Sequence, residues 1–118
     1  MSHNGKDAGD QAEERAGLYL QRAGLRVVTR NYRCRGGEID LVCRDGDTLV
    51  FVEVRMRSNP GFGSALDSVT PAKRRRLVLA ATHYLSRRGW AGPCRFDVVG
   101  IDGGVRLNWC RDAFRADD

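Results

Sequence analysis

Apolar residues recur at helical spacing in two stretches of the chain and alternate or run together in five others. Spacings of three and four residues place side chains on one face of a helix, whereas alternation and short apolar runs are typical of strands. The predicted helices are residues 10–23, ended by Gly24, and residues 70–88, which begin with the cap and first-turn pair Thr70-Pro71 and end at Gly89. The predicted strands are 25–32, 38–44, 48–57, 95–101 and 105–110.

These elements follow one another as a helix, three strands, a second helix and two further strands. The strands at 38–44 and 48–57 are apolar on both faces, as is typical of the middle of a sheet that is covered on each side. We therefore predict an α/β fold in which helices flank a central mixed sheet. In this prediction residues 10–114 form a single domain, a disordered tail occupies 1–9, and residues 58–69 form a long loop of the kind that is often functional or mobile.

The composition narrows the class of protein. With 118 residues, 42% of them hydrophobic and 30% charged, the chain is long enough to bury roughly two-thirds of the surface that its unfolded form exposes. No apolar stretch approaches the roughly 20 residues that span a bilayer, and the polar start does not resemble a secretory signal, so we expect no membrane contact and a cytoplasmic location. The four cysteines lack zinc-ligand spacing and are predicted to be reduced thiols.

Positive charge is concentrated in one part of the chain. The formal net charge is +5, and residues 70–95 include seven lysines and arginines and no acid. Such a segment either contacts a polyanion such as nucleic acid or forms a solvated face. The consecutive bases Lys73, Arg74, Arg75 and Arg76 crowd the first turns of the second predicted helix, where the helix dipole disfavours cations. A phosphate partner would relieve this mismatch, so these four residues are the candidate nucleic-acid contacts.

Three acidic residues, Glu38, Asp40 and Glu53, interrupt the two apolar strands that precede the long loop. An ionised carboxylate in an apolar strand is costly to bury unless it is paired with a cation. Either each acid has its own arginine, or carboxylates from the two strands converge on one face of the sheet.

The turn between these strands decides which carboxylates face each other. An Asp45-Gly46 turn sets Glu38 opposite Glu53, whereas a Gly46-Asp47 turn or a four-residue loop sets Asp40 opposite Glu53. We favour the register that opposes Asp40 and Glu53. Facing carboxylates repel strongly unless a shared proton or a divalent ion lies between them, and oxygen ligands of this kind suit Mg²⁺ or Mn²⁺.

Placed on adjacent strands, Asp40 and the run Glu53-Val54-Arg55 resemble the active-site pattern of the PD-(D/E)xK nuclease superfamily. More narrowly, the chain resembles the YraN-like family of predicted bacterial endonucleases, which are similar to archaeal Holliday junction resolvases. The resemblance spans about residues 9–101, through the segments AEERAGLYLQRAGLRVVTRNYRCRGGEIDLV, DGDTLVFVEVRMR, VTPAKRRRL and CRFDVVGI. It implies a restriction-endonuclease-like fold, Mg²⁺ or Mn²⁺ as cofactor, DNA as partner and hydrolysis of its phosphodiester backbone, with branched DNA as one substrate class. It is also compatible with a homodimer.

Residue by residue, the resemblance assigns Asp40 and Glu53 to the catalytic metal, with the Val54 carbonyl as a further ligand. It also matches Glu13, on the first helix, with a glutamate that resolvase-like nucleases use beside the metal. The alternative for Glu13 is a solvated acid paired with an arginine. Glu38, in the GEID motif, either orients a water of the metal or holds Arg55 across the hairpin.

Arg55 departs from the family pattern, which has lysine at this position. Arginine keeps the positive charge and can clamp phosphate with two hydrogen bonds, but it stays protonated and cannot accept a proton. Lys73, on the inward side of the second helix, either substitutes for the missing lysine or is an exposed lysine with no role in the site. Arg55 either contacts phosphate or pairs with Glu38 or Glu53 of the hairpin.

Asp97 is expected to pair with Arg95.

Two further hypotheses accompany the endonuclease. The first is a DNA-binding accessory module that keeps the fold and the acidic pocket but has lost efficient cleavage, as Arg55 would permit. The second is an adaptor that binds protein instead of nucleic acid.

Overall fold

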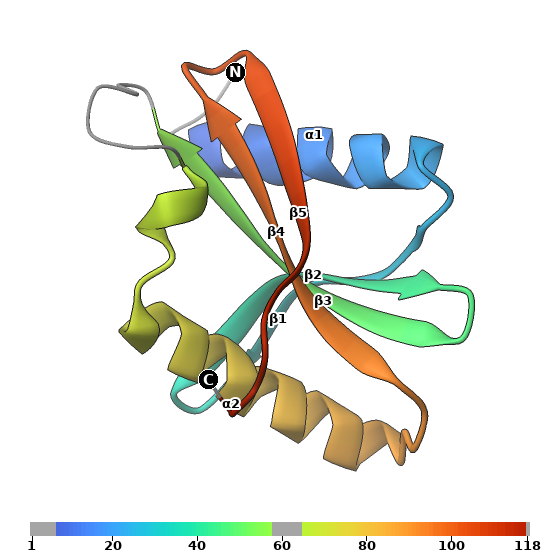
Figure 1. Cartoon of the computed structure of the whole chain (residues 1–118). Coiled ribbons are helices and arrows are strands. Elements are labelled where there is room, and N and C mark those ends of the chain that lie inside the picture. The colour runs from blue at the N-terminus through green and yellow to red at the C-terminus, as the bar shows by residue number, and fades with distance from the viewer. Residues whose placement is uncertain (1–6, 58–64, 118) are drawn as a thin grey trace.

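The computed structural model describes residues 7–57 and 65–117 (Figure 1). Its strands form one five-stranded sheet in sequence order, in which β3 and β4 are parallel and all other neighbours are antiparallel. The architecture is therefore mixed α/β, with the predicted order of helices and strands. The elements are α1 (Asp7–Arg22), β1 (Arg26–Cys34), β2 (Gly37–Asp45), β3 (Thr48–Arg57), the short 3-10 helix η1 (Leu66–Ser68), α2 (Pro71–Arg88), β4 (Cys94–Asp102) and β5 (Arg106–Phe114).

The ends of α2 follow from the chemistry of its cap residues. The Thr70 hydroxyl accepts a hydrogen bond from the Lys73 backbone N–H at 3.2 Å, and Pro71 occupies the first turn, where an N–H would have no helical acceptor. Gly89 ends the helix in the left-handed conformation, with φ of 62°. Both predicted ends of this helix are confirmed.

Two predicted boundaries were wrong by three residues or more. Helix α1 begins at Asp7, so residues 7–9 are helical and do not belong to a disordered tail; residues 1–6 lie outside the described part. Strand β5 continues to Phe114, four residues past its predicted end. An irregularity in the pairing with β4 lets Phe114 face Phe96, and this long-range pairing leaves no signal in the local sequence.

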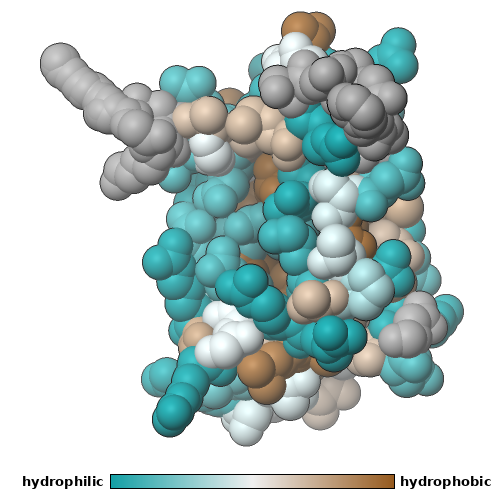
Figure 2. Space-filling model, turned by 90° about the vertical axis from the view of Figure 1, so that its left-hand side faces the viewer, coloured by the Kyte–Doolittle hydropathy of each residue, from teal (hydrophilic) through white to brown (hydrophobic). Residues whose placement is uncertain are grey.

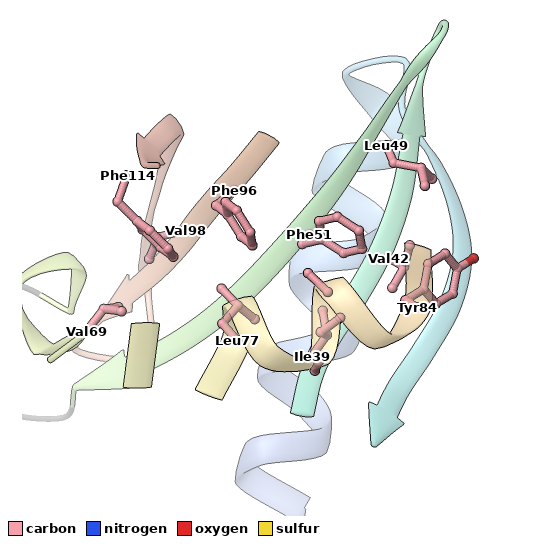
Figure 3. Packing of buried hydrophobic residues seen from close by; sticks show 12 residues of the cluster. Ile39, Val42, Leu49, Phe51, Val69, Leu77, Tyr84, Phe96, Val98 and Phe114 are labelled. Carbon is pink, nitrogen blue, oxygen red and sulfur yellow. The ribbon is translucent and has the colours of Figure 1, made fainter. Parts of the chain in front are cut away.

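One helix covers each face of the sheet, which confirms the prediction from the apolar strands. On one face Ala16 and Leu20 of α1 pack with Leu41, Val50 and Val52. On the other face lies a larger, aromatic cluster (Figure 3). Its buried members are Ile39, Val42, Leu49, Phe51, Val69, Leu77, Ala80, Ala81, Tyr84, Phe96, Val98 and Phe114.

Helix α2 lies unusually close to β2 at Gly37. A Cβ atom at this position would overlap the carbonyl oxygen of Arg76 and approach the Ala80 nitrogen to 3.0 Å. Because both contacts are to helix backbone, no side-chain rotation relieves them. Gly37, the first residue of the GEID motif, therefore allows α2 to lie this close to the sheet.

The remaining predictions concern the loop, the thiols and the membrane. Of the predicted loop at 58–69, residues 58–64 lie outside the described part, and Leu66–Ser68 form η1. All four cysteines are free thiols, and burial raises the pKa of the Cys43 thiol to about 12, as expected for a core residue. Within residues 7–57 and 65–117, no helix is both long and apolar enough to cross a membrane.

Candidate functional site

Strands β2 and β3 pair over only part of their length. Their ladder runs from Asp45 opposite Thr48 to Leu41 opposite Val52, around a two-residue turn at Gly46-Asp47. This is the register that places Asp40 and Glu53 opposite each other, as favoured from the sequence. Beyond this point β3 continues beside β4, whereas β2 stays with β1, so the two strands diverge (Figure 1).

Asp40 lies where the strands diverge, and it is only 9% exposed. Its Oδ2 atom accepts a hydrogen bond from the Val54 backbone N–H at 2.8 Å. That N–H points toward the side of β3 that β2 has left, so the carboxylate replaces a missing ladder partner. The same bond fixes the orientation of the Asp40 carboxyl group.

Three carboxyl groups from three different elements meet at this point. Asp40 of β2 lies close enough to Glu53 of β3 and Glu13 of α1 for its charge to raise the pKa of both. All three line one cavity of about 280 Å³, together with Val54, Arg55 and Lys73. The structure thus brings together the acids that the sequence proposed, and Glu13 contacts another acid instead of being a solvated partner of an arginine.

The side of the molecule on which α1 and α2 begin is seen face-on in Figure 2. Much of this surface is hydrophilic, and apolar residues show in its centre and near its upper and lower edges. The cavity borders on residues from the first turns of both helices, Gly9 and Lys73 among them. It therefore opens between the two helices, at the polar end of the sheet.

The proximity of these carboxyl groups makes them hard to ionise together. Burial, and then the charge of Asp40, raise the pKa of Glu53 to about 8. Burial and the same neighbour raise the pKa of Glu13 to about 7. Burial also raises the pKa of Asp40, although the hydrogen bond from Val54 opposes this effect. In the absence of a cation, Glu53 is therefore expected to hold a proton at neutral pH.

Acidification is expected to stabilise the metal-free wild type relative to its Glu53→Gln variant. Because folding raises the pKa of Glu53 from 4.5 to about 8, the folded protein binds this proton more tightly than the unfolded chain does. The stability that the proton provides is fully present below pH 4.5 and is lost as the pH rises through about 8. Between roughly pH 5 and 9 the difference in unfolding free energy should shift by on the order of 3 kcal/mol. Urea denaturation in EDTA measures it, and a constant difference would contradict the assigned environment.

Arg55 is held at the edge of the cavity by two contacts. Its Nε donates to the Ser68 hydroxyl at 2.9 Å, and its Nη1 lies 3.5 Å from Oε2 of Glu53. The Ser68 hydroxyl in turn donates to the Ala65 carbonyl at 2.6 Å. Arg55 therefore pairs with Glu53, as one of the sequence hypotheses allowed. The recorded partner of Glu38 is Arg76, at 4.0 Å, and not Arg55.

The four consecutive bases of α2 do not share one surface. Lys73 lines the acid cavity, and its charge lowers the pKa of Glu53. Arg76 borders a smaller cleft of about 40 Å³ together with Glu38, Glu53 and Lys73. Arg74 and Arg75 border a separate groove on the other side of the helix. Only half of the predicted nucleic-acid set is thus beside the acids.

Asn31 is a site residue that sequence reasoning missed. It lies in β1 with φ of 53°, a left-handed conformation that few residues other than glycine adopt, and its side chain opposes the rise in the pKa of Glu13. Asparagine tolerates this conformation better than most residues, but nothing in the local sequence indicates that it is adopted here. Backbone strain of this kind is typical of functional positions.

Asp97 does not belong to the site. It is fully buried and accepts hydrogen bonds from Arg95, the Trp109 indole and the Asp112 backbone N–H. The expected pairing with Arg95 is confirmed, with 3.0 Å between Arg95 Nε and Oδ1. Asp97 is a structural acid.

Comparison with known proteins places the chain in a family. The model of the uncharacterised protein family UPF0102 matches residues 12–101. The chain belongs to the UPF0102 family. This confirms the predicted YraN-like membership.

Relatives that are similar over most of the chain carry the same family name. A UPF0102 protein of Nitrosococcus oceani is 56% identical over 117 residues, covering 95% of this chain and 94% of its own. UPF0102 proteins of Cupriavidus necator and Dechloromonas aromatica are 61% and 60% identical over 110 residues, covering 92% and 93% of this chain and 83% and 90% of theirs. The match extends over the helices and strands that supply every acid of the cavity.

Proposed function

We propose that this UPF0102 protein is a metal-dependent endonuclease-like protein that acts on the phosphodiester backbone of DNA, with a restriction-endonuclease-like fold. The observation that carries the proposal is the convergence of Glu13, Asp40 and Glu53 on one cavity where β2 and β3 diverge. The order of helix, three-stranded meander, helix and strand is the order that the family resemblance leads us to expect.

The donor set of the cavity suits a hard divalent cation. Carboxylate and carbonyl oxygens are the ligands of Mg²⁺ and Mn²⁺, and Mg²⁺ sites in nucleic-acid enzymes commonly use one or two carboxylates, with waters and phosphate completing the shell. In the described part of the chain, no group of three or more His, Cys, Asp or Glu side chains is arranged as a ready-made metal site. Asp40 and Glu53 meet the requirement for two carboxylates, and Val54 adds a backbone carbonyl.

The chain's own groups would act on the phosphate in distinct ways. A bound divalent cation would supply Lewis acidity toward the phosphate and a lower pKa for the attacking water. The hydrogen bond from Val54 keeps Asp40 oriented toward the cavity. Arg55 offers a fixed positive charge for the negative charge that develops on the phosphate, but an arginine does not accept protons. Lys73 lines this cavity and is a candidate substitute for the family's missing lysine.

A DNA-binding accessory module is the second candidate. The observation in its favour is that Arg55 already has two partners, Ser68 and Glu53, so phosphate must compete for its guanidinium. Lys73 and Arg76 would still attract DNA through its phosphates, with an affinity that falls as salt is added. The two candidates differ in whether bound DNA is cut.

Cleavage of a substrate panel by the wild type and Arg55→Lys separates the candidates. Under the endonuclease proposal the wild type nicks single-stranded, duplex, flap or four-way junction DNA with Mg²⁺ or Mn²⁺, and Arg55→Lys cuts within about tenfold of it, because the positive charge is kept. Under the accessory-module hypothesis the wild type binds without cutting, and Arg55→Lys gains activity. Gel analysis of end-labelled DNA gives the result.

Arg57→Lys is the matched control, since it makes the same change on β3 outside the residues that line the cavity. It should leave cleavage unchanged, and EDTA should eliminate cleavage in all three proteins. Neither cutting nor salt-sensitive binding of any DNA in the panel would contradict both candidates.

A further inference from the structure

A second concave surface lies on the side of α2 that faces away from the acid cavity. It is a groove of about 470 Å³ between α2 and the residues that follow β5, within the roughly 300 to 1,000 Å³ of ordinary ligand sites. Pro71, Val78, Leu79 and Ala116 contribute its apolar surface. Leu79 is 48% exposed and adds to this apolar surface. The groove therefore offers apolar area that the protein itself does not cover.

Arginines border this groove. Arg74 lies over the Phe114 ring, with 5.5 Å between the guanidinium carbon and the ring centroid, so its side chain is held in position. In the part of the chain that the structure describes, no carboxylate lies within ion-pair distance of Arg74 or Arg75. Arg115 also borders the groove but has Asp112 at 3.7 Å, so Arg74 and Arg75 supply the charge that is left uncompensated.

The position of these two arginines on α2 makes the binding of an anion more favourable. They lie in the first turns of α2, where the N-terminal end of the helix dipole is itself positive. An anionic occupant would therefore gain from both side chains and from the dipole. An apolar occupant would gain by covering Leu79 and Val78. A single partner satisfies both requirements only if it presents apolar and acidic groups together.

We propose that this groove binds an acidic amphipathic segment of a partner protein. Such a segment places leucine-like side chains on Leu79 and Val78 and carboxylates against Arg74 and Arg75, as in other helix-in-groove interfaces. A DNA backbone would satisfy the arginines but presents only small sugar C–H groups between phosphates, which cover little apolar surface. The groove and the acid cavity have no lining residue in common, so this proposal stands independently of the proposed nuclease activity.

Binding of a designed peptide tests the proposal. The probe is a fluorescein-labelled helical peptide with leucines on one face at three- and four-residue spacing and glutamates beside them; its partner peptide has lysine in place of each glutamate. Fluorescence anisotropy with the full chain should show saturable binding of the glutamate peptide and none of the lysine peptide. Leu79→Ser and Arg75→Glu should each weaken binding by about tenfold or more.

Two matched variants control for general effects of these changes. Leu18→Ser removes an equally exposed leucine from α1, and Arg87→Glu reverses a charge at the far end of α2, both outside the groove. Both should bind the glutamate peptide as the wild type does. The proposal is overturned if all four variants bind alike or if neither peptide binds.

Two other occupants would also overturn the proposal. If a DNA duplex displaces the peptide from the wild type and itself binds about tenfold more weakly to Leu79→Ser and Arg75→Glu, the groove is a nucleic-acid surface. If sedimentation shows a dimer that Leu79→Ser dissociates, the groove is covered by a second copy of this chain.

Discussion

Replacing Glu53 by glutamine is expected to lower DNA cleavage by at least about a hundredfold while making the metal-free protein more stable above neutral pH. The amide keeps the shape of the side chain, which is 13% exposed, but provides no negative charge for a cation. It also removes the repulsion between Glu53 and Asp40, which together with burial raises the pKa of Glu53 to about 8. The unfolding free energy at about pH 9 should therefore rise by on the order of 2 kcal/mol.

The opposite signs of the two effects make this experiment decisive. End-labelled DNA reports cleavage, and urea denaturation in EDTA reports stability. Asp47→Asn is the control, because Asp47 is an exposed acid in the turn of the same hairpin and should change neither quantity. Cleavage that survives in Glu53→Gln would identify a contaminating nuclease. A loss of stability would mean that Glu53 is mainly an ion-pair partner of Arg55.

The centre of the candidate site was predictable because hairpin geometry is local. Side chains alternate along a strand, so the identity of the two turn residues determines which acids face each other. Gly46 has φ of 60°, which suits the first position of the Gly46-Asp47 turn, and the register that opposes Asp40 and Glu53 follows from it. The cap residues of α2 likewise act over a few positions, and both of its ends were predicted.

The features that the sequence did not show depend on contacts between distant segments. Four consecutive bases on a helix are separated by about 100° each, so Lys73 and Arg76 share a face from which Arg74 and Arg75 are turned away. Which face meets the acids depends on how closely α2 packs on Gly37, a tertiary contact. The left-handed Asn31 beside Glu13 has the same kind of cause. In each case the sequence identifies the type of residue, but only the folded structure shows where its side chain lies.

Asp97 is a buried acid with a structural role, in contrast to the three carboxyl groups of the acid cavity. Its carboxylate is fully buried and has a donor for each oxygen: Arg95 Nε and the Asp112 backbone N–H for Oδ1, and the Trp109 indole for Oδ2 at 2.9 Å. The carboxyl groups of the cavity instead lie beside one another, where the charge of Asp40 raises the pKa of Glu13 and Glu53. A fully satisfied carboxylate contributes to a defined fold, and this one joins β4 to the last part of β5.

Asp97→Ala is accordingly expected to cost about 3 to 5 kcal/mol of unfolding free energy, since it leaves the Trp109 indole and the Asp112 backbone N–H without their acceptor and Arg95 with Asp45 alone. Asp45→Ala is the matched control. Asp45 also pairs with Arg95, at 2.9 Å, but its side chain is 34% exposed, so its removal should cost less than about 1 kcal/mol. Urea denaturation of both variants measures the contrast. If both variants lost the same unfolding free energy, burial would not explain the difference expected between the Asp97 and Asp45 ion pairs with Arg95.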